Sequence, residues 1–130
     1  MSFKDLPIQK PELKKLYQDL GEQKIRQIIR VFYEAMEKDA MIGFFFTGRN
    51  LVSIADKQTE FLMRAMGVLS SYNGKPPAAA HQDLPPILTG HFDRRLKILE
   101  SVLKQNGLNQ RQIETWIGFE NAFREAVIKS

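Results

Sequence analysis

The 130-residue sequence has no cysteine and only two histidines. Without cysteine, the chain forms neither a disulfide nor a thiolate metal site. The histidines, His81 and His91, stand in neither an HxxxH nor an HxxE pattern, so a zinc or di-iron site made by protein ligands alone is not expected. The sequence also has no run of about 18 apolar residues, the length that a membrane-spanning helix needs. We therefore expect no stable membrane insertion.

The N-terminal segment lacks the apolar stretch of a secretory signal. Residues 1–10 carry charges and Pro7 instead. We interpret them as an N-terminal extension ahead of a single domain at 11–130. A cytoplasmic location is our expectation.

The excess of positive charge is small. The formal net charge is +4, and basic residues alternate with acidic ones along the chain. The densest basic cluster, Arg94, Arg95 and Lys97, lies between Asp93 and Glu100. Nucleic-acid binding draws on clustered positive charge that displaces counterions from phosphates. We interpret this cluster as a solvated helical face and expect no nucleic-acid partner.

The apolar residues recur at the three- and four-residue spacing of amphipathic helices, and no strand-like alternation is present. Glycine, proline and capping residues mark the boundaries. Helices are expected over 11–20 and 22–38, after an Asn50 cap, from a Thr89 cap to Gly107, and from an Asn109 cap through Ile113, Trp116, Ile117, Phe123 and Val127. Between 67 and 86, four prolines leave room for one short helix at 78–82. The sequence thus predicts an all-α fold around one core.

Two polar residues interrupt the apolar stripes of these helices. Tyr33 lies on the inward face of one helix and Gln58 on the inward face of another. A buried hydroxyl or amide without a partner costs about 1–3 kcal/mol, so such groups are normally paired or face a ligand. Either the two side chains satisfy each other or backbone groups, or they point toward a bound ligand.

His81 and a phenylalanine run are the other unusual features. His81 stands in a short segment between prolines; it is either a surface residue or a ligand to a metal whose other ligands come from a porphyrin. Phe44, Phe45 and Phe46 are consecutive between two glycines. Three consecutive aromatic side chains cannot share one face of a helix. They either fill the core at a connection, or some of them meet a flat apolar group or solvent.

The chain resembles the truncated, two-over-two haemoglobins over essentially its whole length after Lys10. Residues 31–50 (VFYEAMEKDAMIGFFFTGRN) resemble the B helix and the CD region of that family, and 55–62 (ADKQTEFL) resemble its distal E helix. Residues 72–87 resemble the loop and short F helix that carry the proximal histidine, and 90–93 (GHFD) the start of the G helix. The order and spacing of these segments imply a two-over-two helical sandwich around haem b.

The resemblance also implies roles for individual residues. His81 matches the proximal ligand of the haem iron. Tyr33 and Gln58 match the distal residues that stabilise the bound gas. Matches to other haem-contacting positions are Phe32, Phe45, Phe46, Ile54, Lys57, Phe61, Leu62, Tyr72, Ile87 and Phe92. The distal set of tyrosine, apolar residue and glutamine is most like the first group of the family, and Lys57 matches a basic residue that often pairs with a haem propionate.

The function implied by the resemblance is reversible binding of oxygen, with nitric oxide and carbon monoxide as further ligands. Conversion of nitric oxide to nitrate is the candidate enzyme activity, and it requires a reductase that this chain does not contain. Two alternatives differ in chemistry. One is a six-coordinate haem protein for electron transfer or redox sensing, with Lys57 or Tyr33 on the iron, and the other is a haem-free helical interaction module.

Overall fold

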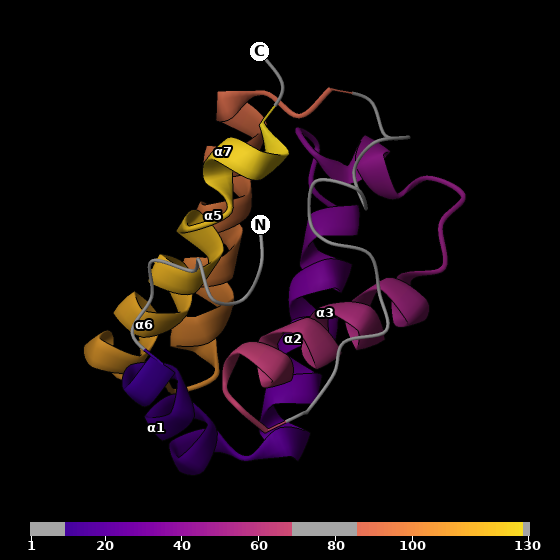
Figure 1. Cartoon of the computed structure of the whole chain (residues 1–130). Coiled ribbons are helices and arrows are strands. Elements are labelled where there is room, and N and C mark those ends of the chain that lie inside the picture. Colours follow the sequence, from indigo (N-terminus) through magenta and orange to yellow (C-terminus); the bar gives the residue numbers. More distant parts are fainter. Residues whose placement is uncertain (1–9, 69–85, 129–130) are drawn as a thin grey trace.

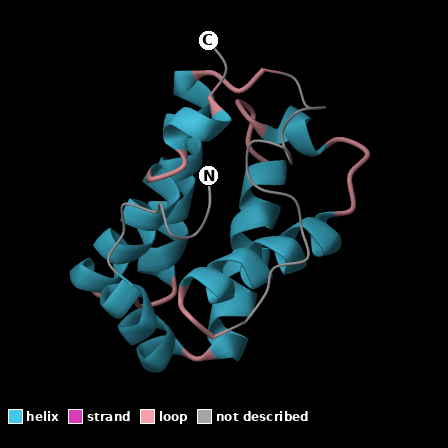
Figure 2. Ribbon diagram, viewed as in Figure 1, coloured by secondary structure: helices cyan, strands magenta, loops and turns pink. Residues whose placement is uncertain are grey.

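The computed structural model describes residues 10–68 and 86–128, and the regular structure in these two ranges is entirely helical (Figures 1 and 2). The helices are α1 (Lys10–Leu20), α2 (Glu22–Glu37), the 3₁₀ helix η2 (Gly43–Phe46), α3 (Leu51–Ala65), α5 (Thr89–Gln105), α6 (Gln110–Asn121) and α7 (Arg124–Val127). The prediction of an all-α fold is confirmed. The expected short helix at 78–82 lies outside the described residues, as does nearly all of the expected extension at 1–10.

Two helix pairs form the body of the molecule (Figure 1). Helix α2 packs on α3, α5 packs on α6, and α2 also contacts α5, so that one pair lies over the other. Helix α1 closes one end through contacts with α2, α3 and α6. This is the two-over-two arrangement predicted from the sequence. Among the described residues, no helix combines the length and the apolar character needed to cross a membrane.

The core lies where the two pairs meet. Its largest fully buried side chains include Trp116 and Phe119 from α6 and Phe32 from α2. The stripe predicted on α2 is buried as expected, with Ile25, Ile28, Ile29, Phe32, Tyr33 and Met36. Burial of such side chains is the main favourable term in folding.

Two of the three predicted helix caps are confirmed. The Asn50 side chain accepts a hydrogen bond from the Ser53 N–H at 3.0 Å, and Asn109 accepts one from the Gln112 N–H at 2.9 Å. These contacts satisfy N–H groups that have no partner within the first turn of a helix.

The predicted cap at Thr89 is wrong, because Thr89 is already the first residue of α5 and Leu88 takes the cap position. Nδ1 of His91 accepts a hydrogen bond from the Leu88 N–H at 3.0 Å. His91, the third residue of α5, thus takes the part that Glu or Gln plays in a capping box, where the side chain accepts from the N–H of the cap residue. The last predicted helix is also divided, into α6 and α7, by a turn at Ala122 and Phe123.

A tight turn after α2 determines where the phenylalanine run of residues 44–46 lies. The Asp39 carboxylate accepts hydrogen bonds from the Met41 and Ile42 N–H groups at 2.9 and 3.1 Å. Gly43 follows, and a Cβ atom there would collide with the Glu37 carbonyl oxygen. Glycine is therefore required where the chain turns back against the end of α2.

Candidate functional site

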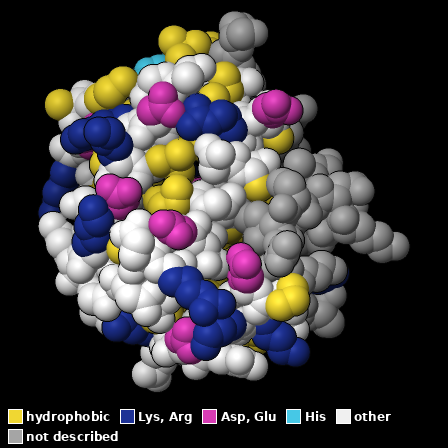
Figure 3. Space-filling view, turned by 90° about the vertical axis from the view of Figure 1, so that its left-hand side faces the viewer, with side chains coloured by type: hydrophobic (Ala, Val, Ile, Leu, Met, Phe, Trp, Pro, Cys, Tyr) yellow, Lys and Arg dark blue, Asp and Glu magenta, His cyan; other side chains and the backbone are white. Residues whose placement is uncertain are grey.

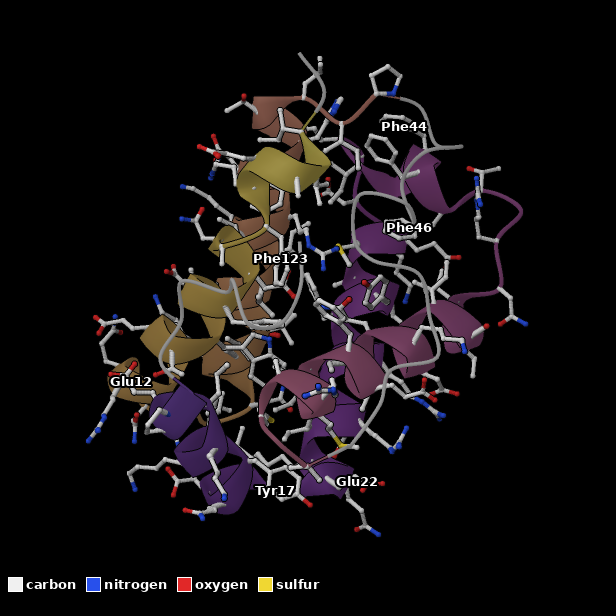
Figure 4. All side chains as sticks on the ribbon, viewed as in Figure 1. Glu12, Tyr17, Glu22, Phe44, Phe46 and Phe123 are labelled. Atoms are coloured by element: carbon white, nitrogen blue, oxygen red, sulfur yellow. The ribbon has the colours of Figure 1, made fainter. Side chains whose placement is uncertain are left out.

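A cavity of about 110 Å³ lies between the two helix pairs. Its described wall is mostly apolar, and Figure 4 shows Phe46, from the η2 side, and Phe123, from the α6–α7 side, directed into the interior. The apolar lining consists of Met36, Ile42, Phe45, Phe46, Phe61, Ile87, Phe92, Phe123 and Val127, and the polar lining of Tyr33, Gln58, His91, Arg95 and Glu120. The cavity thus combines aromatic surface with a small set of polar groups, which is the composition typical of a ligand site.

Four of the polar side chains form one connected network. Nε and Nη2 of Arg95 donate to Oε2 of Glu120 at 3.2 and 3.1 Å. Nη2 of Arg95 also donates to the Tyr33 hydroxyl oxygen at 3.5 Å. Nε2 of Gln58 donates to Oε1 of Glu120 at 3.2 Å. Tyr33 and Gln58 are therefore linked through an ion pair, although no direct hydrogen bond joins them among the described contacts.

Burial and charge set the protonation of this network. Burial raises the pKa of Tyr33, the Arg95 charge lowers it, and the Glu120 charge raises it, with a net upward shift. Burial acts to lower the pKa of Arg95, but Glu120 and Tyr33 outweigh it, and the value lies above that of an ordinary arginine. The site therefore holds a neutral phenol beside a charged guanidinium.

The aromatic rings at the cavity edge differ in exposure. Phe45 is buried, Phe46 is partly buried, and Phe44 keeps 48% of its surface exposed. His91 lies edge-on to Phe44 and Phe45, with ring centroids 5.7 and 5.1 Å apart. Tyr33 and Phe46 meet edge to face at 5.8 Å. The three phenylalanines therefore do not all fill the core. Phe45 does, while Phe44 meets solvent, which agrees with the second of the two interpretations of this run.

Comparison with known proteins places the chain in a family. A model of the bacterial-like globins matches residues 15–129. The chain belongs to the bacterial-like globin family. Its relatives include a group 1 truncated haemoglobin of Tetrahymena pyriformis, 27% identical over 99 residues that make up 75% of this chain and 81% of the relative. A second, group 1 truncated haemoglobin LI410 of Chlamydomonas moewusii, is 29% identical over 94 residues, which are 72% of this globin but 55% of that protein.

The solved structures that resemble this globin are also truncated haemoglobins. The ferric Tetrahymena pyriformis protein aligns with a TM-score of 0.80 and 24% identity, over 88% of this chain and 98% of that one. The 2/2 haemoglobin of Synechococcus aligns with a TM-score of 0.78 and 24% identity, over 87% and 97%. At this identity the similarity establishes the fold. The prediction of a truncated haemoglobin most like the first group is confirmed by the family and the relatives together.

Membership of the globin family implies a haem cofactor, and the residues of the cavity fit one. A porphyrin presents two flat apolar faces, and five phenylalanines contribute to the cavity wall. Four of the five polar groups meet in one network, and apart from His91 the rest of the described wall is apolar. Among the described residues, no group of three histidine, cysteine or acidic side chains is placed to hold a metal ion. A porphyrin supplies most of the iron ligands itself, so this globin needs no such group.

The described wall contains many of the residues that the resemblance indicated. The predicted residues that line the cavity are Tyr33, Phe45, Phe46, Gln58, Phe61, Ile87 and Phe92. Phe32 is buried behind Tyr33, with ring centroids 5.4 Å apart. Leu62 is buried in the core, and Ile54 packs against the core while partly buried.

The remaining three predicted residues are Lys57, Tyr72 and His81. The Lys57 side chain is 50% exposed and lies 4.0 Å from the Glu60 carboxylate, outside the cavity lining. His81 and Tyr72 lie outside the described residues. Their assignment as proximal ligand and haem contact stays a prediction.

The ion pair of Arg95 and Glu120 was not predicted from the sequence, and the interpretation of Arg95 as part of a solvated face is wrong. The Arg95 and Glu120 side chains are 19% and 7% exposed. By contrast, Arg94 is 45% exposed, and on the face shown in Figure 3 basic and acidic side chains are interspersed. A signal was present, because Arg95 follows Phe92 by three residues and Glu120 precedes Phe123 by three. Both charges therefore stand on apolar stripes, as Tyr33 and Gln58 do.

Proposed function

We propose that this globin holds haem b through His81 and reversibly binds oxygen, and also nitric oxide and carbon monoxide, on the side of the cavity that carries Tyr33. The finer part of the proposal is the conversion of nitric oxide to nitrate with electrons from a separate reductase, in the cytoplasm. Haem, when bound, supplies an iron centre that takes up a diatomic gas. The remaining tasks of orientation, hydrogen bonding and exclusion of water belong to the side chains of this chain.

The observation that carries the proposal is a protonated phenol at the wall of an apolar cavity. Tyr33 is 5% exposed and lines the cavity. Because its hydroxyl oxygen accepts from Arg95, its single proton is directed elsewhere. A gas ligand that gains negative charge on binding is a suitable acceptor. In a site shielded from water such a hydrogen bond is stronger than in solvent.

The aromatic wall supports the same proposal. Phe61, Phe119 and Phe123 form a cluster in which ring centroids lie 5.2 to 5.9 Å apart. Phe61 and Phe123 line the cavity, and Phe45 and Phe46 line it from η2. An aromatic surface of this kind disfavours water, which favours retention of the gas and of the cofactor.

The test is the visible absorption spectrum of protein supplied with haem, in ferric and ferrous forms, compared with His81→Ala. We expect a strong Soret band in the wild type, a stable oxygen complex, and loss or alteration of the band in His81→Ala. A folded helical wild type that takes up no haem contradicts the proposal. A wild-type spectrum with a six-coordinate ferrous form in the absence of gas supports the electron-transfer alternative instead.

A matched control distinguishes the effect of removing the iron ligand from the effect of removing any histidine. His91→Ala removes the other histidine, which lines the cavity but whose Nδ1 is engaged by the Leu88 N–H. We expect His91→Ala to retain the Soret band and the oxygen complex. If His91→Ala loses haem and His81→Ala keeps it, the assignment of His81 as proximal ligand is wrong.

A further inference from the structure

A buried pair of opposite charges forms part of the cavity wall. Arg95 comes from α5 and Glu120 from α6, and both line the cavity. Removing two such charges from water carries a large penalty, and apolar residues of similar volume are often at least as stabilising. A site for neutral gases alone is served by an apolar wall. Charges at this position therefore point to a role in ligand binding.

The Glu120 carboxylate is already engaged on both oxygens. Oε2 accepts from Arg95, and Oε1 accepts from Gln58. The groups of this network that suit an anion are its remaining donors. They are the Tyr33 hydroxyl, whose oxygen accepts from Arg95, and the remaining N–H groups of Gln58 and Arg95.

One nitrogen of Arg95 has a poor partner. Among the described residues, Nη1 donates to the thioether sulfur of Met36 at 3.5 Å, and thioether sulfur is a weak acceptor. Met36 and Arg95 both line the cavity. The guanidinium is otherwise fixed, because it lies 4.9 Å over the Phe32 ring and 5.6 Å over the Tyr33 ring. An anion in the cavity is a much stronger acceptor for Nη1 than the sulfur is.

We propose that Arg95 determines ligand specificity in this cavity by favouring small monovalent anions over neutral ligands of similar size. Glu120 holds the guanidinium in place and limits its net charge, and Tyr33 donates beside it. This inference rests on the proposed function, because it takes the cavity to be the gas-binding side of the haem. It adds a residue of this chain, Arg95, that selects small anions with nitrogen or oxygen acceptors.

The test compares azide binding to the ferric protein with carbon monoxide binding to the ferrous protein, both followed by visible absorption. Arg95→Met removes the charge with little change of length. We expect its dissociation constant for azide to rise about tenfold or more, as for loss of a charge-assisted hydrogen bond, while that for carbon monoxide changes less than about threefold. Glu120→Gln leaves the Arg95 charge unopposed, and we expect tighter azide binding.

Arg94→Met is the matched control. Arg94 is the next residue on α5 and is also ion-paired, with Asp39 at 2.7 Å, but it does not line the cavity. We expect no change in either dissociation constant. If Arg94→Met weakens azide binding as much as Arg95→Met does, the effect comes from overall charge and the proposal is wrong.

A second readout reports the field in the cavity independently of affinity. The infrared stretching frequency of bound carbon monoxide is sensitive to nearby charge, and positive charge lowers it. We expect the frequency to rise in Arg95→Met and to fall in Glu120→Gln. The same direction of shift in both variants contradicts the proposed role of charge.

Two further variants keep the test decisive if Arg95→Met does not fold. Arg95→Lys retains the positive charge and is expected to retain the preference for azide. The double variant Arg95→Met/Glu120→Leu replaces the pair by apolar residues and is expected to lose it. If wild type binds haem and carbon monoxide but the preference for azide is unchanged in the double variant, this inference fails while the proposed function stands. If wild type takes up no haem, both fail.

Discussion

Nε2 of Gln58 lies 3.2 Å from Oε1 of Glu120, and this hydrogen bond joins α3 to α6 across the wall of the cavity. The resemblance to truncated haemoglobins predicts Gln58 as a donor to bound gas. In this globin one of its amide hydrogens is already engaged, whereas the Tyr33 hydroxyl keeps its proton for a ligand. We therefore expect the two residues to be unequal, with Tyr33 the principal donor to a bound gas.

Replacement of Tyr33 by phenylalanine tests this ranking. Tyr33→Phe removes the hydroxyl and preserves the ring that packs on Phe32 and Phe46. We expect oxygen to dissociate about tenfold faster in stopped-flow measurements, which corresponds to one hydrogen bond of about 1.4 kcal/mol. Gln58→Leu is expected to have a smaller effect. A change of less than about twofold in Tyr33→Phe, or a larger change in Gln58→Leu, contradicts the ranking.

A pair of glycine substitutions tests the turn that places Phe45 and Phe46. At Gly43, a Cβ atom collides with the Glu37 carbonyl oxygen, which belongs to the backbone and cannot turn aside. We expect Gly43→Ala to lower the free energy of unfolding by about 1–3 kcal/mol. At Gly118, within α6, a Cβ atom has no neighbour within 4 Å, and Gly118→Ala is expected to raise stability by about 0.5–1 kcal/mol. Chemical denaturation measures both, and equal effects contradict the steric argument.

The Asp39–Arg94 ion pair predicts how stability depends on pH. Its hydrogen bond from Arg94 is the main cause that holds the pKa of Asp39 below its ordinary value of 3.8. A lowered pKa in the folded state means that the stabilisation is fully present above the ordinary value and is lost as the pH falls through the folded value. Asp39→Asn keeps an oxygen for the Met41 and Ile42 N–H groups but removes the charge.

We expect Asp39→Asn to be less stable than wild type at neutral pH, and this difference to shrink below pH 3.8. Urea unfolding at neutral pH and at successively lower pH measures it. Asp19→Asn is the control, because Asp19 pairs with Lys15 on the exposed surface of α1, and exposed pairs of this kind contribute little. A difference between wild type and Asp39→Asn that is independent of pH contradicts the assigned role of the charge.

The features of the fold that could be predicted from the sequence are those that depend on residues close together along the chain. The Asn50 and Asn109 caps act on backbone N–H groups three residues away, and the α2 stripe follows from helical spacing. His91 as the acceptor at the start of α5 was missed, because Glu and Gln are the residues expected to accept from the N–H of the cap residue.

In the candidate site, too, some residues could be predicted from their neighbours along the chain and others could not. Tyr33 and Gln58 were recognised because each is a polar residue on an apolar stripe. Arg95 was interpreted as solvent-exposed because Arg94 and Lys97 stand beside it in the sequence. Its partner Glu120 is 25 residues away on another helix. A long-range ion pair is decided by how α5 packs on α6, and local sequence contains no measure of that packing. The family resemblance did not indicate either charge.

We expect Arg95 and Glu120 to contribute to stability as a coupled pair. Arg95→Met leaves the Glu120 carboxylate buried beside Gln58 without its cation, and we expect a loss of about 3 kcal/mol, the lower end of the range for buried pairs, because Arg95 keeps 19% exposure. Arg95→Met/Glu120→Leu removes both charges, and most of the loss is expected to be recovered. Thermal and urea unfolding of the wild type, Arg95→Met, Glu120→Leu and the double variant give the coupling energy of the two residues. If the decreases in the free energy of unfolding of the two single variants simply add in the double variant, Arg95 and Glu120 are not energetically coupled, and the expectation is wrong.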